Sequence, residues 1–326
     1  MSSTGSVSFD RNDDAPDDEW NERLLKSEFG TIFQTTEYGK YEELIQKSEP
    51  KYYKFRDKND AVVGQILLFK QSRGKGKLTK FIPRISLTWT HGPVVFNDSY
   101  YNEISAKLCN FLSSKNFQGS PHPQDKKFVF QDKYNFEKQD AATFIIDLNQ
   151  RLEDIFKNTD KKSVQKNIER SRDRGVTISE FTINDDDDVK SYSVLLNEHR
   201  KSNDLPGYSH EQVKEVLKLA TSKGTGAGFL AWYKKKLIGG IFISAFNRYI
   251  NEWGIARDKT DTDEKLYAQD LLRWTIIAWG KENGCRFYDL SGFKYPVSKQ
   301  SQKEKGIYQN KKKWGGKETV YTIFKH

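Results

Sequence analysis

Cysteine is scarce in this chain, and the patterns of metal sites and membrane segments are missing. Only Cys109 and Cys285 occur among 326 residues, in unlike segments, so no disulfide framework is predicted. The five histidines form no HExxH pattern, and no pair of ligands has zinc spacing, so we expect no metal site. No apolar run approaches the ~18 residues that span a bilayer, and no secretory signal is visible. We therefore expect a cytoplasmic protein.

Motifs for nucleotides and nucleophiles are missing too. There is no Walker lysine motif and no GxSxG elbow. The loop Gln71–Gly76 fits the Q/RxxGxG pattern by which many acetyltransferases hold the CoA pyrophosphate on backbone amides. That use requires a helix directly after the loop, whereas residues 78–89 contain Pro83 and a β-like pattern. We interpret the loop as a basic hairpin loop. The glycine-rich residues 224–228 precede a strand, so they are not a dinucleotide fingerprint.

Aromatic residues, by contrast, are plentiful, at 13% of the chain. Disordered chains lack such content, so we expect a packed core although charged residues reach 30%. At roughly 150 residues per domain, the length predicts about two domains. Both halves show strands in hairpins, then a helix, then more strand. This order predicts an α+β fold and not a doubly wound parallel sheet, with a boundary near Leu148.

The formal net charge of +9 is unevenly distributed. Residues 1–20 carry −5 and are interpreted as an acidic N-terminal tail. Residues 70–84, 161–175 and 294–317 carry +6, +4 and +7, so the rest of the chain is net negative. Any one basic stretch is explained equally well as a solvated face. Three in one chain favour a polyanionic partner.

Several local elements are predicted. A basic helix over residues 161–174 ends at Gly175, a typical helix C-terminal residue. Residues 128–130 have the pattern of a strand, and residues 267–283 that of a long helix. A short strand ends in the motif Tyr288–Gly292, and a lysine cluster next to a tryptophan and two glycines follows at 311–316. This cluster either places a cation close to backbone or is a solvated basic helix.

Four segments, in this order, resemble the FemABX family, the aminoacyl-tRNA-dependent peptidyltransferases that build peptidoglycan cross-bridges. The segments are residues 33–40, 89–94, 162–176, and the pair 288–292 with 311–316. The resemblance implies two tandem GNAT-like subdomains without the coiled-coil arm of some members, facing one cleft. The subdomains would be residues 21–147, joined by the final strand 317–326, and residues 148–316.

The resemblance also implies acyl transfer from a carrier to an amine, without metal, cofactor or covalent enzyme intermediate. The family's lysine maps onto Lys311, whose implied role is to stabilise the oxyanion or the carrier's ribose-phosphate. Two departures, Asn310 for an aromatic residue and Leu205 for an arginine, leave the acceptor open. The residues expected to bind substrate are Lys40, Trp253, Tyr288, Asp289 and Trp314. Those expected to bind tRNA phosphates are Lys162, Lys166, Arg170, Lys312 and Lys313.

Three hypotheses follow. In the first, a monomeric acyltransferase moves an aminoacyl group from charged tRNA to an amine of a peptide or of a phosphate-bearing envelope precursor. In the second, the same fold uses acyl-CoA, as the related acetyltransferases do. In the third, the chain is a non-catalytic basic binding protein. Binding of charged tRNA with a steep dependence on salt would favour the first.

Overall fold

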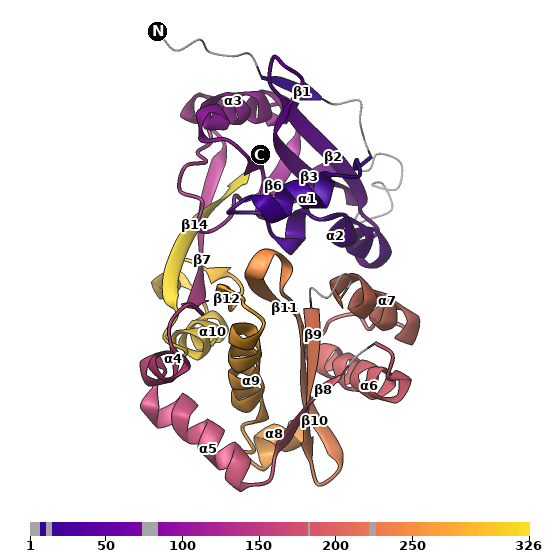
Figure 1. The fold of residues 1–326 in the computed structure, drawn as a ribbon, viewed down its shortest axis with the longest axis vertical. Helices are drawn as coiled ribbons and strands as arrows, with labels where there is room; N and C mark the ends of the chain where they lie inside the picture. The colour runs from indigo at the N-terminus through magenta and orange to yellow at the C-terminus, as the bar shows by residue number, and fades with distance from the viewer. Residues whose placement is uncertain (1–6, 11–14, 74–83, 182, 222–225) are drawn as a thin grey trace. The chain divides into compact units, whose positions relative to one another are not determined.

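The computed structural model describes residues 7–10, 15–73, 84–181, 183–221 and 226–326, which form two compact units (Figure 1). Unit 1 comprises Met1–Ala142 with the short segments Lys294–Pro296 and Thr319–His326. Unit 2 comprises Thr143–Phe293 and Val297–Glu318. Each unit has its own run of strands and its own apolar core, so each is described by itself.

Unit 1 is built on a mixed sheet with the strand order β1-β2-β3-β4-β6-β14-β7. Strands β2, β3 and β4 pair antiparallel, whereas β4 and β6 run parallel on either side of the connection through α3. The elements of unit 1 are β1 (Ser8–Asp10), α1 (Trp20–Lys26), α2 (Thr36–Tyr41), the π-helical turn η2 (Glu42–Gln46), β2 (Glu49–Arg56), β3 (Val62–Arg73), β4 (Arg84–Trp89), β5 (Val94–Val95), α3 (Tyr101–Leu112), β6 (Asn116–Gly119), and most of β7 (Glu137–Asp147) and of β14 (Lys317–Lys325).

The core of unit 1 forms where the apolar face of α3 covers the sheet. Ile104 and Leu108 on α3 lie one turn apart and are fully buried, as their spacing predicts. Phe128 and Phe130 also enter this core, but they belong to no strand, so the prediction of a strand at 128–130 is wrong. The Ser105 hydroxyl donates to the Val129 carbonyl, so a side chain, not a strand partner, binds this backbone.

The N-terminal segment is more than a solvated tail. Strand β1 pairs with β2, and Val7 is buried in the core. Asp17 forms ion pairs with Arg23 and with Lys54, whose side chain is almost fully buried. A buried ammonium needs such a partner because its desolvation is costly. Part of the acidic segment therefore serves to neutralise cations of unit 1.

Unit 2 repeats the scheme with the strand order β7-β12-β11-β10-β9-β8. Strands β9, β10 and β11 pair antiparallel, as predicted, and β11 runs parallel to β12 on either side of α9. The elements of unit 2 are α4 (Leu152–Asn158), the π-helical turn η5 (Lys161–Gln165), α5 (Lys166–Asp173), β8 (Thr177–Phe181), α6 (Asp186–Ser202), α7 (His210–Thr221), β9 (Gly226–Tyr233), β10 (Lys236–Ser244), β11 (Tyr249–Arg257), α8 (Lys259–Asp263), α9 (Ala268–Glu282), β12 (Phe287–Asp289), β13 (Phe293–Lys294) at its edge, and α10 (Gln302–Lys312).

Helices cover both faces of the unit 2 sheet. Helices α6 and α7 pack on one face and α9 on the other, with α5 packed against α9 (Figure 1). The basic helix begins later than predicted, because a π-helical turn precedes α5, but it ends as predicted before Gly175, whose φ is +82°. The C-terminal helix α10 covers Gln302–Lys312 and places Lys311 in its last turn.

Candidate active site

The parallel pair β11 and β12 ends at a buried carboxylate in unit 2. Asp289, the last residue of β12, accepts hydrogen bonds from the Thr143 hydroxyl, from the Tyr249 hydroxyl at 2.8 Å and from the Ser291 N–H at 2.8 Å. Burial raises the pKa of Asp289, and these hydrogen bonds oppose the rise. The third bond holds Ser291 at a φ of +67°. Asp289 therefore fixes the turn that follows the strand.

Lys311 reaches this turn from α10. Its ammonium donates to the carbonyl oxygens of Ser291 at 2.8 Å and Gly292 at 3.2 Å. An ammonium has three N–H bonds, and among the described residues Lys311 has no further hydrogen-bond partner, so one donor remains for a ligand. Desolvation lowers the pKa of Lys311, while the charges of Glu252 and Asp289 oppose that shift. The site thus holds a half-buried cation in a fixed position.

A second buried pair lies beside this cation. The side chain of Arg273 on α9 donates Nε to Glu252 Oε1 at 2.9 Å, and Tyr288 donates its hydroxyl to the same oxygen. The Glu252 side chain is only 4% exposed. Desolvation acts against the Arg273 charge, but the neighbouring Glu252 raises the pKa of Arg273 overall. Sequence reasoning missed both residues, although a lone arginine in the apolar run 271–280 is a signal of a buried acidic partner.

The start of α9 is already occupied by carboxylates of the chain. Asp261 is fully buried, accepts from the Ala268 N–H at 2.8 Å and pairs with Arg257 at 2.7 Å. Asp270, in the first turn, binds Lys313 at 2.8 Å and Asn167 at 2.7 Å. A helix N-terminus attracts anions through its N–H groups and its dipole. Here the protein supplies those anions itself.

Comparison with solved structures places this geometry in a known fold. The chain is similar to FemX with a TM-score of 0.72 at 11% identity, over 97% of this chain and 96% of that chain. The chain has the FemX fold. The resemblance predicted from the sequence is confirmed at that level, and so is the α+β class with two tandem GNAT-like subdomains. No family model and no curated protein matches the sequence.

Two further solved structures share the FemX fold with this chain. One is the C-terminal domain of a putative lysylphosphatidylglycerol synthetase from Agrobacterium fabrum, with a TM-score of 0.58 and 9% sequence identity. That match covers 93% of this chain and 91% of that chain. The other is a tandem GNAT protein from the clavulanic acid biosynthesis pathway, with a TM-score of 0.51 at 10% identity over 98% of both chains.

The stretch 174–208 carries β8 and α6, and its described residues form no coiled-coil arm.

The residues predicted to bind substrate are dispersed within the FemX fold. Tyr288 and Asp289 lie beside Lys311, but both side chains are buried and bonded within the protein. Trp253 on β11 packs against the apolar core under α6. Lys40 is exposed on α2 in unit 1. Of this set, Asp289 acts on Lys311 through its charge, Tyr288 binds the neighbouring Glu252, and the Trp314 N–H donates to the Lys311 carbonyl at 3.1 Å.

Trp314 and the two glycines after it have a packing role. Trp314 is buried directly after α10. A Cβ on Gly315, whose φ is +71°, would lie 2.2 Å from the Asn158 carbonyl oxygen, and one on Gly316 would lie 3.0 Å from that of Ile145. The chain passes so close to neighbouring backbone that only glycine fits at residue 315. The two glycines thus allow the end of α10, which holds Lys311, to pack closely against neighbouring backbone.

The predicted phosphate-binding residues divide into two groups. Lys162, Lys166 and Arg170 are exposed on η5 and α5, and Lys312 is exposed with its ammonium 5.6 Å from the Tyr308 ring. Lys313 instead neutralises buried Asp270. Four of the five cations are therefore available to an external anion.

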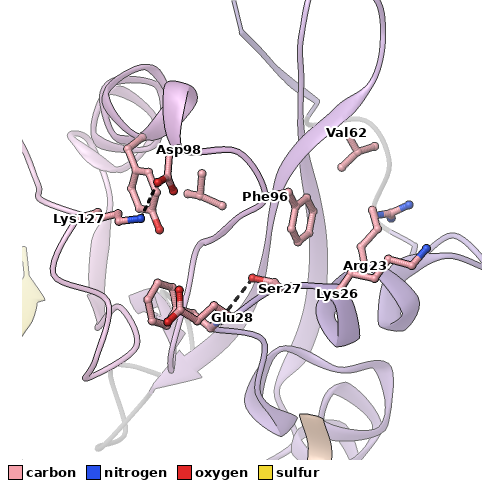
Figure 2. Close-up of a pocket in the computed structure, with 11 residues that line it drawn as sticks. Arg23, Lys26, Ser27, Glu28, Val62, Phe96, Asp98 and Lys127 are labelled. Carbon is pink, nitrogen blue, oxygen red and sulfur yellow. Dashed lines mark hydrogen bonds and ion pairs between the residues drawn. The ribbon is translucent and has the colours of Figure 1, made fainter.

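Unit 1 contains a cavity of about 280 Å³ between α1 and the start of α3 (Figure 2). Its apolar walls include Val62 and Phe96. Of the cations that line it, Lys127 pairs with Asp98 at 2.6 Å, and Arg23 is engaged by Asp17 outside the cavity. The third, Lys26, lines the cavity together with Glu28, so the described lining carries both signs of charge and gives no indication of its ligand.

Other chemistries find no support in the described residues. Burial raises the pKa of the Cys109 thiol, and that of Cys285 to about 11, so neither is an activated nucleophile. Within the described ranges, no three acidic, histidine or cysteine side chains are arranged to hold a metal ion. No helix in those ranges is long and apolar enough to cross a membrane.

Proposed function

We propose that this chain is an acyltransferase that forms an amide bond by moving an aminoacyl group from charged tRNA to an amine. Two observations support the proposal together. The chain shares the fold of FemX over nearly its whole length. In unit 2, at the end of the parallel strand pair, Lys311 presents a fixed ammonium with one N–H left for a ligand. The second observation carries the proposal.

The reaction needs a charge stabiliser more than a nucleophile on the protein. The amine nitrogen attacks the carbonyl carbon of the aminoacyl ester, and the carbonyl oxygen becomes negative as the C–N bond forms. The C–O bond to the ribose then breaks, and the proton lost by the amine ends on the ribose hydroxyl. A preorganised cation beside the developing oxyanion lowers the barrier because that charge exists only in the transition state. In this scheme Lys311 donates its remaining N–H to that oxygen.

The surroundings of Lys311 suit this role. Its two carbonyl partners fix the ammonium without neutralising it, because carbonyl groups carry no net charge. Asp289 stabilises the turn that presents these carbonyls. Glu252 is engaged by Arg273 and Tyr288, so it acts on Lys311 through its field and forms no ion pair with it. A cation held in this way can exchange water for a substrate oxygen with little rearrangement.

The exposed cations of unit 2 support an RNA donor. Lys166 and Arg170 are four residues apart and share one face of α5, while buried Ile168 faces the protein. Lys162 precedes them on η5, and Lys312 follows the candidate catalytic residue directly. Phosphate contacts by lysine and arginine release counterions, so the proposal expects binding that weakens steeply with salt.

The alternative donor, acyl-CoA, fits less well. A CoA pyrophosphate requires free backbone N–H groups at a helix start, but the first turn of α9 is held by Asp261 and Asp270. Part of the loop Gln71–Gly76, and the residues 77–83 that follow it, lie outside the described residues, which resume at β4. Residues 224 and 225 of the glycine-rich run 224–228 lie outside them too, and the rest of the run begins β9. Carboxylates would repel a pyrophosphate at α9.

A transfer assay with tRNA carrying a radiolabelled amino acid tests the proposal. The wild-type chain should transfer label to an amine acceptor, and Lys311→Ala should lower the rate by about 10²-fold, the usual effect of removing an oxyanion donor. Lys303→Ala is the matched control, because Lys303 is an exposed lysine on the same helix.

Three outcomes would count against the proposal. Equal rates for Lys311→Ala and Lys303→Ala would remove the role of Lys311. Turnover with acyl-CoA but not with charged tRNA would replace the donor. Salt-dependent RNA binding without any transfer would instead support a non-catalytic binding protein.

A further inference from the structure

A second cavity of unit 1, of about 240 Å³, differs from the first in its charge. It lies over the sheet where Phe69 on β3, Thr88 on β4 and Gln118 on β6 stand in one row, because Phe69 pairs with Thr88 and Thr88 with Gln118. Tyr38 on α2 and Glu42, directly after α2, also line the cavity. Ligands commonly bind where parallel strands end at such a sheet edge.

Among the described residues that line this cavity, a single side chain is charged at neutral pH. Glu42 is the only acidic residue among the lining residues, and none of them is a lysine, arginine or histidine. Its carboxylate accepts from the Tyr38 hydroxyl at 3.0 Å and from the Ser48 hydroxyl at 3.4 Å, and both donors are neutral. Among the described residues no cation pairs with it. The cavity therefore contains an anion without a counter-charge.

This carboxylate is destabilised in the empty cavity. Burial raises the pKa of Glu42, and the two hydrogen bonds oppose the rise only in part. A ligand that brings a positive charge would offset the desolvation of the carboxylate, whereas an anionic ligand would increase the repulsion. The aromatic rings of Tyr38 and Phe69, whose centroids are 5.7 Å apart, line the same space. Aromatic faces and a carboxylate together favour an alkylammonium group.

The predicted phosphate-bearing acceptor does not suit this cavity. Lys40, the cation expected to contact the acceptor, is two residues from both Tyr38 and Glu42 on α2. Residues two apart on a helix do not share a face, whereas Tyr38 and Glu42, four apart, do. Lys40 is exposed and is absent from the cavity lining. A phosphate here would meet a carboxylate and no cation.

We propose that this cavity of unit 1 binds the ammonium group of an alkyl diamine, a class that includes basic amino acids, with the charge on Glu42 and the aliphatic stem against Phe69 and Tyr38. The cavity volume is at the small end of ligand sites, which suits the short alkyl chain of such a diamine. The second amine of the ligand stays free. The role of that second amine as acceptor, unlike the binding itself, rests on the proposed function.

Calorimetric titration of the full chain tests the binding without any turnover. The probes are 1,5-diaminopentane and n-pentylamine, with 1-pentanol as the neutral analogue and glutarate as the anionic one. Both amines should bind, and the other two should not. Glu42→Gln should weaken binding of the amines at least tenfold, whereas Glu43→Gln, which removes the same charge from the neighbouring exposed residue, should leave it unchanged.

The folded state of the variant needs its own check. Glu42→Gln should unfold at the same temperature as wild type or higher, because a neutral amide avoids the desolvation of a carboxylate and its oxygen still accepts from Tyr38. Loss of amine binding in a variant of undiminished stability supports the assignment. Equal binding of 1-pentanol, stronger binding of glutarate, or wild-type binding by Glu42→Gln would overturn it.

A transfer assay with 1,5-diaminopentane separates the two proposals. Amine binding without transfer from charged tRNA would leave the cavity assignment intact and contradict the proposed function. Transfer to the diamine that is insensitive to Glu42→Gln would contradict the acceptor role of this cavity and leave the proposed function intact.

Discussion

The two units use one scaffold for opposite charges. In unit 1 the antiparallel strands lead through α3 to the parallel pair β4 and β6, and in unit 2 they lead through α9 to the parallel pair β11 and β12. Beside the first pair lies a cavity with the unneutralised carboxylate of Glu42. Beside the second lies the ammonium of Lys311. The scaffold fixes where a functional group stands, and the side chains decide what chemistry it performs.

The units also differ in how each charge is stabilised. Lys311 is surrounded by the network of Asp289, Glu252 and Arg273, whose charges bear on it from three elements. Glu42 has only neutral hydrogen-bond donors. Unit 2 thus prepares its charge in advance, as a site of catalysis requires, whereas unit 1 leaves its charge to be matched by a ligand. The predictions below test how far this contrast extends to stability.

The largest effect is expected from breaking the buried pair of unit 2. Arg273→Met should lower the free energy of unfolding by about 3–5 kcal/mol, because it leaves Glu252 buried without its cation. The double variant Arg273→Met with Glu252→Leu should recover most of that loss, since an apolar pair of similar volume is often neutral. Urea unfolding measures both. A single variant as stable as wild type would show that the Arg273 charge does not stabilise this fold.

Acid should act on unit 1 through a pair of buried histidines. The rings of His91 and His122 are 4.9 Å apart, and burial lowers the pKa of both, that of His91 to about 3. Thr31 contacts His91, Phe29 contacts His122, and the positive charge of Lys126 lowers the pKa of His122 further. Both imidazoles are therefore neutral in the folded protein.

The sign of the pH effect follows from the two states. An unfolded histidine has a pKa near 6.5, so below that pH the unfolded chain binds protons that the folded one does not. The free energy of unfolding should fall by about 1.4 kcal/mol per pH unit for His91 between about pH 6.5 and 3, and the lowered pKa of His122 adds a loss of the same sign. Calorimetry of wild type against His91→Asn isolates one histidine: the difference between them should narrow as the pH falls. A pH-independent difference would show that folding does not lower the pKa of His91.

The sequence was sufficient for elements with strong periodic patterns. The strand pattern of the second half predicted hairpins, and β9, β10 and β11 pair in that way. The same logic failed at residues 128–130, because alternating buried phenylalanines also occur in irregular segments. Periodicity indicates which side chains are buried, but it does not show whether the backbone of the segment pairs with a neighbouring strand.

The candidate site was predictable only in part. The motif around Asp289 and Lys311 pointed to two segments that the structure brings together. Asp289 stabilises the turn after β12 through Ser291, and its bonds to Thr143 and Tyr249 come from strands far apart in the sequence. The pairing of Glu252 with Arg273, 21 residues away, has no local pattern. Such partners are set by packing of a helix on a sheet, which single-sequence reasoning does not resolve.

The smallest effects are expected at three glycines, which separate steric contact from backbone strain. Gly119 in unit 1 has no left-handed φ, but a Cβ there would lie 2.1 Å from the ring of buried Trp89, which Gly92 fixes through a hydrogen bond. Gly175 in unit 2 has a φ of +82° with nothing within 4 Å. Gly315 combines a φ of +71° with a contact at 2.2 Å to backbone.

Alanine substitutions at the three glycines should lower the free energy of unfolding by different amounts. Gly175→Ala should lower the free energy of unfolding by about 1–2 kcal/mol through left-handed strain alone. Gly119→Ala should cost about 1–3 kcal/mol through overpacking alone, and Gly315→Ala should exceed either because both terms act. Urea unfolding gives the ranking, and transfer activity adds a second readout. Because Gly315 follows α10 directly, only Gly315→Ala should also lower transfer activity, by displacing Lys311. Loss of activity in Gly175→Ala, with unchanged stability, would instead show that the basic helix α5 matters more to the reaction than the position of α10.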